Sequence, residues 1–199
     1  MVAPTPFRLG FVTGATPDKW ARIWRERRRD PLELVPTLQE GQEVLLRADH
    51  DERVDMALVR LPIDRTGLHC IPLYDEGPVV LAGRDHFVAA ADGSVVLADL
   101  ATEQLVLPHA SGWTPDAEQL NWPEMSASEA VETVAAGTGI VLLPRSVARL
   151  HARKDVVERE VLDLPSTKIA LAWLIDRDDE RTQAFVGMVR GRSANSSRS

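Results

Sequence analysis

The sequence predicts an α/β protein whose strands form a parallel sheet. Between residues 7 and 61, apolar runs of strand length alternate with segments of helical spacing, an order typical of parallel sheets covered by helices. The composition, with 44% hydrophobic and 27% charged residues, is that of a globular domain. The 199 residues allow one large domain or two small lobes, enough to bury about 70% of the unfolded surface.

The N-terminal part of the chain supplies this alternation. Its first helix is the best defined, because Thr16 suits the N-cap and Pro17 suits the first helical position. Trp20, Ile23 and Trp24 fall at helical spacing and are expected to face the core. In chain order, the expected elements are a strand at 7–12, a helix at 16–30, a strand at 32–38, a weaker helix at 40–53 and a strand at 55–61.

The remaining elements follow from shorter patterns. The clearest is a helix that begins at Ser128, carries apolar residues on one side and ends at Gly137. The polar tail at 191–199 is expected to be disordered. The other expected elements are strands at 69–74, 78–82, 103–108, 140–143, 156–164 and 168–175, and helices at 144–151 and 181–190.

Charge and cysteine content narrow the class of protein. The chain has 23 basic and 30 acidic residues, and its net charge of −7 provides no general attraction to nucleic acid. The longest apolar runs, at 139–144 and 169–175, are too short to span a bilayer, and we expect neither a membrane segment nor a signal peptide. The single cysteine, Cys70, cannot form an internal disulfide, so a reducing, cytoplasmic location is predicted.

No metal site, cofactor or catalytic constellation is predicted. The five histidines show no metal-ligand spacing among themselves or with Cys70. A nucleophile elbow, an HExxH motif and a P-loop are absent from the sequence. Gly137-Thr138-Gly139 follows a helix and precedes a strand, whereas a nucleotide loop runs from strand to helix. We interpret its glycines as a helix end and a tight turn.

Four stretches, in their order and spacing, resemble the effector-binding (substrate-binding) domain of LysR-type transcriptional regulators. Together they span nearly all of residues 7–190, and the ordered set is more specific than any single stretch. The stretches are FRLGFVTGATP at 7–17, ERVDMALVRLP at 52–62, LHCIPLYDEGPVVLAGRDH at 68–86 and SASEAVETVAAGTGIVLLPRSVA at 126–148.

The resemblance implies an α/β fold of two Rossmann-like lobes joined by two crossover strands, like that of type II periplasmic binding proteins, with a small-molecule site in the cleft. Lobe I would contain residues 1–83 and 166–199, and lobe II residues 84–165. The winged helix-turn-helix of the family's regulators is not expected in this chain. The stretch between Pro108 and Met125 is shorter than is usual in the family, so lobe II is expected to be reduced.

Thr13, Gly14, Ala15 and Thr16 are the first candidate ligand contacts. They lie between a strand and a helix N-terminus, where unpaired N–H groups and the helix dipole favour an anion, and the threonine hydroxyls add donors. The resemblance also implies that this loop contacts the effector. The alternative is that Thr16 is only an N-cap.

Ser126, Ala127 and Ser128 precede the second well-defined helix, and the same physics applies to them. Two helix N-termini that face one cleft would suit a carboxylate effector. The alternative is capping alone, with Ser128 only approximately spaced from Glu129 or Glu132 for a capping box.

Four further residues are candidate contacts. Arg60, after the third strand, would bind a carboxylate in a bidentate way, or else is a surface arginine or part of an ion pair within lobe I. His109 and Ser111 would enter the cleft from lobe II, although a lone histidine is more often structural. The resemblance implies that Thr138 faces the ligand.

Two groups of residues have an ordinary structural alternative that we favour. The basic run from Arg22 to Arg29 either contacts nucleic acid or a partner chain, or is solvated at a helix end, where the dipole stabilises cations. Trp113 and Trp122 either line the pocket or close the core of lobe II.

The predicted function is ligand sensing. The domain would bind a small organic acid or aromatic metabolite, close its lobes and transmit the change through a homodimer, without itself contacting nucleic acid or a membrane. The alternative is a stand-alone binding or interaction module that buffers a metabolite or forms heterodimers with full-length regulators. An enzyme on the same fold is the least favoured hypothesis.

Overall fold

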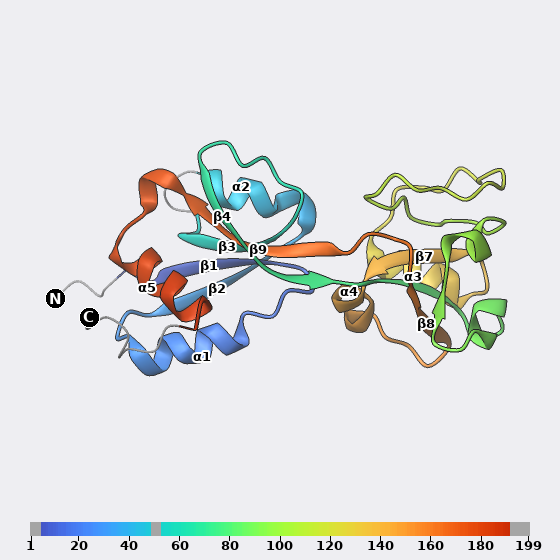
Figure 1. Ribbon diagram of the computed structural model, residues 1–199, viewed down its shortest axis with the longest axis horizontal. Helices are drawn as coiled ribbons and strands as arrows, with labels where there is room; N and C mark the ends of the chain where they lie inside the picture. Colours follow the sequence, from blue (N-terminus) through green and yellow to red (C-terminus); the bar gives the residue numbers. More distant parts are fainter. Residues whose placement is uncertain (1–4, 49–52, 192–199) are drawn as a thin grey trace. The chain divides into compact units, whose positions relative to one another are not determined.

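The chain folds into two compact units (Figure 1). The computed structural model describes residues 5–48 and 53–191. Unit 1 comprises residues 1–74 and 168–199, and unit 2 comprises residues 75–167. Two parts of the predicted elements lie outside the described residues, namely 49–52 of the second helix and 192–199 of the tail.

Unit 1 is built on a five-stranded sheet of order β2-β1-β3-β9-β4. β1 pairs in parallel with β2 and β3, which confirms the parallel arrangement predicted for the first three strands, whereas β9 runs antiparallel to β3. The elements are β1 (Phe7–Val12), α1 (Asp18–Arg27), β2 (Leu32–Thr37), η1 (Gln39–Gly41), α2 (Gln42–Arg47), β3 (Met56–Arg60), β4 (Leu68–Glu76), β9 (Thr167–Leu174), η4 (Ile175–Arg177) and α5 (Glu180–Val189).

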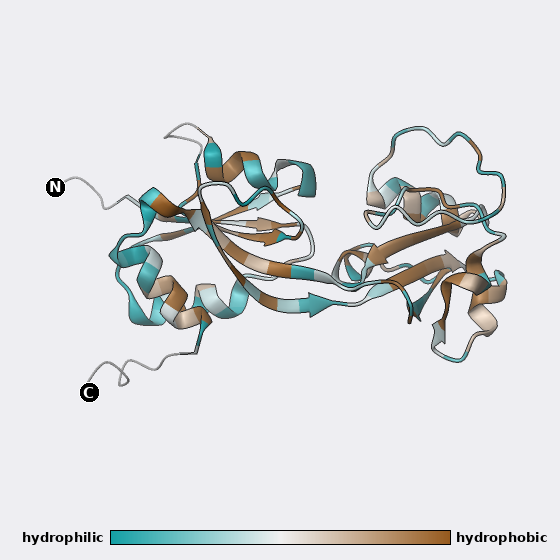
Figure 2. Cartoon of the chain, turned by 45° about the horizontal axis from the view of Figure 1, so that its top comes forward, coloured by the Kyte–Doolittle hydropathy of each residue, from teal (hydrophilic) through white to brown (hydrophobic). Residues whose placement is uncertain are grey.

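An aromatic stack forms the centre of the larger core cluster of unit 1. The Phe7 ring centroid lies 4.5 Å from that of Trp24 and 5.7 Å from that of Phe185. Trp24 is fully buried, and Trp20 and Ile23 are partly buried against the same cluster, so the predicted core face of the first helix is confirmed. Figure 2 shows that the strands are mostly hydrophobic and that the helices mix hydrophilic and hydrophobic residues.

Unit 2 contains a four-stranded sheet of order β6-β8-β5-β7. β5 is antiparallel to both β7 and β8, and only β6 pairs in parallel, with β8. Alternate residues of β5 and β7 enter two hydrophobic clusters, so both faces of the sheet are covered. The elements are β5 (Pro78–Gly83), η2 (Phe87–Ala90), β6 (Ser94–Val95), η3 (Leu97–Leu100), α3 (Ala127–Ala135), β7 (Ile140–Pro144), α4 (Arg145–Leu150) and β8 (Val156–Val161).

The boundary between the units differs from the expected one. The first lobe was expected to extend to residue 83, but β5 pairs with β7 and β8 and therefore belongs to unit 2. The chain enters unit 2 near the end of β4 and returns to unit 1 at the start of β9. The short elements η2, β6 and η3 were not predicted, because two to four residues show no hydrophobic period.

The strand expected at 103–108 does not form, and a single bridge between Leu105 and Ile140 connects this segment to the sheet. Two glutamine side chains, which we call the glutamine brace (Gln104 and Gln119), hold the segment instead. The Gln119 carboxamide accepts from Leu105 N–H and donates to the Glu103 carbonyl, at 2.8 and 2.9 Å. The Gln104 carboxamide oxygen accepts from Leu120 N–H at 2.8 Å. These side chains satisfy backbone groups that a neighbouring strand would otherwise pair.

Candidate functional site

The carboxyl ends of β1, β2 and β3 meet in unit 1, where one hydrogen-bond network ties them together. We call it the strand-end network (Thr13, Thr37, Gln42 and Arg60). The Thr13 N–H and hydroxyl both donate to the Thr37 carbonyl, at 2.9 and 3.2 Å. The Gln42 carboxamide accepts from Arg60 N–H at 2.7 Å and donates to the Arg60 carbonyl at 2.8 Å. Arg60 Nη2 donates to the Thr13 carbonyl at 3.1 Å, which closes the chain of contacts.

Arg60 lies inside unit 1, with 2% of its surface exposed. The alternative of a surface arginine is therefore wrong. A buried guanidinium needs hydrogen-bond partners, and one of these is the Thr13 carbonyl. Arg60 thus supports the loop after β1 from within the unit. Gln42 in turn fixes the backbone of Arg60, and sequence analysis assigned it no role because a single glutamine forms no recognisable pattern.

The loop at 13–16 turns the chain between β1 and α1. Gly14 has a φ of +90°, a left-handed conformation that favours glycine. The N–H groups of Thr13 and Ala15 are engaged, since Ala15 N–H donates to the Val12 carbonyl at 2.9 Å. In the described part of the chain, the N–H groups of Gly14 and Thr16 have no hydrogen-bond acceptor. Half of the predicted backbone donors are thus used within the unit, and half are available.

α1 starts without a side-chain cap. Pro17 occupies the N-cap position with φ −77° and ψ −9°, and the helix begins at Asp18. The prediction that Thr16 caps the helix is wrong, because the N-cap position falls on Pro17 and no side chain hydrogen-bonds to the N–H groups of the first turn. First-turn N–H groups have no partner within a helix, so this N-terminus favours an anion even though Asp18 places one acidic side chain there.

α3 starts with its own cap, which is Ser126 rather than the predicted Ser128. Glu129 Oε2 accepts from the Ser126 N–H and hydroxyl, each at 2.7 Å, and Ser126 Oγ accepts from Glu129 N–H at 3.3 Å. These hydrogen bonds lower the pKa of Glu129. This capping box places an ionised carboxylate at the helix N-terminus. Ala127 N–H and the exposed Ser128 are the predicted contacts that the capping box leaves available.

His109 and Ser111 form a closed turn. His109 Nδ1 accepts from Ser111 N–H at 3.2 Å and lies 2.9 Å from Ser111 Oγ. Ser111 Oγ in turn accepts from Trp113 N–H at 3.2 Å. Because Nδ1 is an acceptor, the ring proton is assigned to Nε2, and burial lowers the pKa of His109. These contacts support the structural alternative for His109.

Thr138 lies in a tight turn between two glycines with left-handed backbone angles. Gly137 has φ +87° and Gly139 has φ +68°, and a Cβ on Gly139 would lie against the Gln104 carbonyl. The interpretation of the two glycines as a helix end and turn is confirmed, since Gly137 follows α3 and Gly139 precedes β7. Thr138 itself is exposed.

Trp113 and Trp122 belong to the core of unit 2, and the basic run lies at the end of a helix, as the structural alternatives stated. Trp122 and Trp113 pack against the two core clusters of unit 2. In the basic run, Arg28 pairs with Asp30 at 2.9 Å and with Glu180 at 3.3 Å, and these hydrogen bonds raise its pKa.

Within residues 5–48 and 53–191, no three His, Cys, Asp or Glu side chains form a group that suits a metal ion. None of the helices in these residues is long and apolar enough to cross a membrane. Cys70 is half-buried, and its burial raises the pKa of the thiol.

The LysR substrate binding domain family matches the chain over residues 4–194. The chain belongs to this family. This match confirms the resemblance identified from the sequence. LysR substrate-binding domains are effector-binding modules of regulators and not enzymes.

Solved LysR effector-binding domains share the two-lobed α/β fold. The effector binding domain of a BenM variant matches with a TM-score of 0.75 and 22% identity, over 94% of this chain and 93% of that one. The reduced OxyR regulatory domain from Pseudomonas aeruginosa matches with a TM-score of 0.69 and 20% identity, over 93% and 95% of the two chains.

Two curated relatives carry the name "Probable hydrogen peroxide-inducible genes activator". The Mycobacterium avium protein is 32% identical over 163 residues, and the Mycobacterium leprae (strain TN) protein is 31% identical over 160 residues. These alignments include 74% and 73% of this LysR domain. The chain spans about half the length of these relatives, 51% in each case.

Proposed function

We propose that this LysR effector-binding domain senses a small organic acid, aliphatic or aromatic, whose carboxylate binds at the N-terminus of α1. The observation that carries the proposal is the uncapped start of α1 beside the unpaired N–H groups of Gly14 and Thr16. Backbone N–H groups and the dipole at a helix N-terminus stabilise a carboxylate there.

The distribution of charge between the units supports this choice. Unit 1 has seventeen basic and fifteen acidic residues, a formal charge of +2, whereas unit 2 has six basic and fifteen acidic residues, a charge of −9. Unit 1 therefore attracts an anion and unit 2 repels one. The start of α3 adds a local obstacle, because the Glu129 carboxylate already occupies it.

The roles of the individual residues follow from their contacts. We propose that Gly14 N–H and the Thr16 N–H and hydroxyl bind the carboxylate, and that Arg60 acts as a positioning residue through Thr13. Ser128 and Thr138, which are exposed, remain proposed contacts in unit 2. We propose no ligand contact for the candidates whose polar groups already serve the fold of their own unit; they are Ala15 in unit 1 and Ser126, His109 and Ser111 in unit 2.

We further propose that the domain acts as a homodimer in the cytoplasm and reports effector binding within a regulator. The alternative is a stand-alone module that buffers a metabolite or heterodimerises with full-length regulators. Light scattering tests the first proposal, and a monomer at high concentration would contradict it. Capture of a full-length LysR regulator from the same cell by the tagged chain would favour the alternative.

The names of the mycobacterial relatives raise a peroxide response as a second candidate. Redox-sensing cysteines are accessible thiolates, often beside a second cysteine. Cys70 is half-buried, its pKa is raised, and the 199-residue sequence has no second cysteine. These features favour a small-molecule effector over oxidation of this thiol. Intact-mass measurement after peroxide treatment checks this, and rapid stoichiometric oxidation of Cys70 would reverse the preference.

A thermal-shift titration with benzoate, salicylate and succinate tests the carboxylate proposal, with benzyl alcohol as the uncharged control. A ligand at a hundred times its Kd stabilises the fold by about 2.7 kcal/mol. We expect a saturable shift for at least one carboxylate and a weaker one in Thr16→Val, with Ser128→Ala as the matched variant at the other helix. If Ser128→Ala weakens binding more than Thr16→Val, or if no carboxylate binds, the assignment to α1 is wrong.

A further inference from the structure

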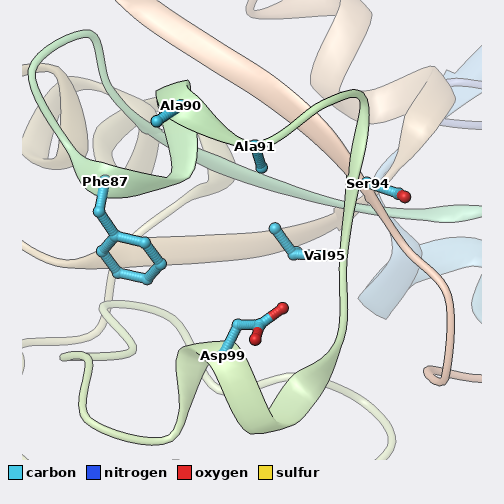
Figure 3. A pocket seen from close by; sticks show the side chains of 6 residues that line it. All are labelled: Phe87, Ala90, Ala91, Ser94, Val95 and Asp99. Atoms are coloured by element: carbon cyan, nitrogen blue, oxygen red, sulfur yellow. The ribbon is translucent and has the colours of Figure 1, made fainter.

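Unit 2 carries a surface hollow that none of the proposed effector contacts lines. Its volume is about 460 Å³, within the range of small-ligand sites. Figure 3 shows that η2, β6 and η3 surround it. The lining residues are Phe87, Ala90, Ala91, Ser94, Val95 and Asp99.

The wall of the hollow is mainly apolar, and its largest side chain is Phe87. Phe87 remains 49% exposed although its ring is hydrophobic. The neighbouring His86 ring lies 4.6 Å from it, centroid to centroid. His86 is itself fixed, because its Nδ1 accepts from Val88 N–H at 3.3 Å and its Nε2 lies 2.9 Å from Glu103 Oε2. The Phe87 ring therefore presents an exposed apolar surface at the hollow.

Asp99 provides the charge in the lining. Its carboxylate is directed toward the hollow in Figure 3, and its Oδ2 accepts from Val96 N–H at 3.0 Å. Among the described residues, no basic side chain forms an ion pair with Asp99. The Arg159 guanidinium donates to the backbone carbonyls of Ala89 and Ala91. The charge of −9 on unit 2 strengthens the attraction of this carboxylate for a cation.

We propose that this hollow is a second ligand site, specific for a small amphipathic cation such as an aryl- or alkylammonium. The apolar body packs on Phe87 and Val95, and the ammonium group pairs with Asp99. The Phe87 ring offers the cation an additional cation–π contact. The inference does not rest on the carboxylate proposal, since it concerns a different unit and a ligand of opposite charge.

The charge requirement is tested by NMR titration of the full chain with benzylammonium, benzyl alcohol and benzoate at pH 7. We expect benzylammonium to give saturable shifts at Ala90, Ala91 and Val95, with weaker binding of benzyl alcohol and none of benzoate. Equal affinities for benzylammonium and benzyl alcohol would overturn the role of Asp99, and the absence of saturable shifts would overturn the site.

Two matched variants locate the charge. Asp99→Asn keeps an acceptor for Val96 N–H and removes the charge, and we expect it to weaken benzylammonium about threefold to fivefold, the effect of an exposed ion pair. Asp163→Asn is the control, because Asp163 accepts from Leu97 N–H at 2.8 Å in the same way but does not line the hollow. If both variants weaken benzylammonium binding equally, the effect comes from the overall negative charge of unit 2, and the proposed site is wrong.

A third variant tests the apolar wall. Phe87→Ala removes an exposed side chain, so the fold is expected to survive, while the affinities for benzylammonium and benzyl alcohol both fall. Unchanged affinities in Phe87→Ala would show that the ligands bind elsewhere. The urea midpoint of each variant confirms that a lost signal reflects binding and not unfolding.

Discussion

The starts of α1 in unit 1 and α3 in unit 2 look alike in sequence and differ in structure. Each follows a loop with hydroxyl side chains, and each was predicted to hold an anion. The N-terminus of α3 is capped by a capping box of Ser126 and Glu129, whereas α1 has Pro17 at its N-cap position and no side-chain cap. A hydroxyl before a helix therefore does not define an anion site; what matters is whether the chain itself has already satisfied the N–H groups.

The units also differ in how they hold their irregular segments. In unit 1 the buried Arg60 and Gln42 join the end of β3 to the loop after β1, and Thr13 joins that loop to the end of β2. In unit 2 the glutamine brace and the tight turn at Gly139 hold residues 101–126, which form no helix or strand. The first arrangement fixes a loop in which the N–H groups of Gly14 and Thr16 remain available. The second uses side-chain amides to satisfy the backbone where a predicted strand does not form.

The largest effect is expected from the turn of unit 2. In Gly139→Ala the new Cβ would lie against the Gln104 carbonyl at a φ of +68°, and we expect a loss of about 4 kcal/mol in unfolding free energy. Gly137→Ala is the matched control, because its φ of +87° is similarly strained but no atom lies within 4 Å of its Cβ. It is expected to lose about 1–2 kcal/mol. Equal losses in urea unfolding would show that the close approach to Gln104 is unimportant.

The next effect concerns unit 1. Arg60→Leu removes the guanidinium that donates to the Thr13 carbonyl, and we expect a loss of about 3 kcal/mol, the effect of leaving buried groups unpaired. Hydrogen exchange should also quicken at Thr13, whose N–H is bonded to the Thr37 carbonyl. The exposed Arg65→Leu serves as control. Unchanged exchange at Thr13 in Arg60→Leu would show that the network does not fix the loop.

A smaller effect compares the two helix starts directly. Ser126→Ala removes the cap of α3 and should lower the unfolding free energy by about 1 kcal/mol. Thr16→Ala lies before a helix without a side-chain cap, so we expect a change within about 0.5 kcal/mol. Chemical denaturation of both variants measures the difference. If Thr16→Ala loses more unfolding free energy than Ser126→Ala, Thr16 caps α1 after all, and the two helix starts do not differ in this way.

The smallest effect is a pH dependence in unit 2. Burial lowers the pKa of His109 below its ordinary value of 6.5, so the unfolded chain binds a proton before the folded chain does. This contribution to stability is complete above pH 6.5 and is lost as the pH falls from 6.5 through the folded-state pKa. His109→Asn keeps an acceptor for Ser111 and should flatten urea midpoints between pH 5 and 7. His151→Asn serves as the control. If the urea midpoint of His109→Asn changes with pH as steeply as that of His151→Asn, groups other than His109 cause the pH dependence.

Local patterns predicted a large part of the fold. The three parallel strands, the buried face of α1 and the helix end at Gly137 each follow from apolar period or turn chemistry within a few residues. The failures were also informative. The segment 103–108 has the apolar pattern of a strand, but Gln104 and Gln119 satisfy its backbone from positions that no period marks.

The sequence by itself determined the α/β class, most elements, the core faces and membership of the LysR substrate-binding family, because propensity, periodicity and ordered motifs are local properties of the chain. Only the tertiary structure decided which helix start stays open, that Arg60 is buried, and that Phe87 and Asp99 share a hollow. The physical reason is distance along the chain: Gln42 and Thr13 lie 18 and 47 residues from the Arg60 that they contact. Hydrogen bonding between such distant groups depends on how the sheet brings strand ends together.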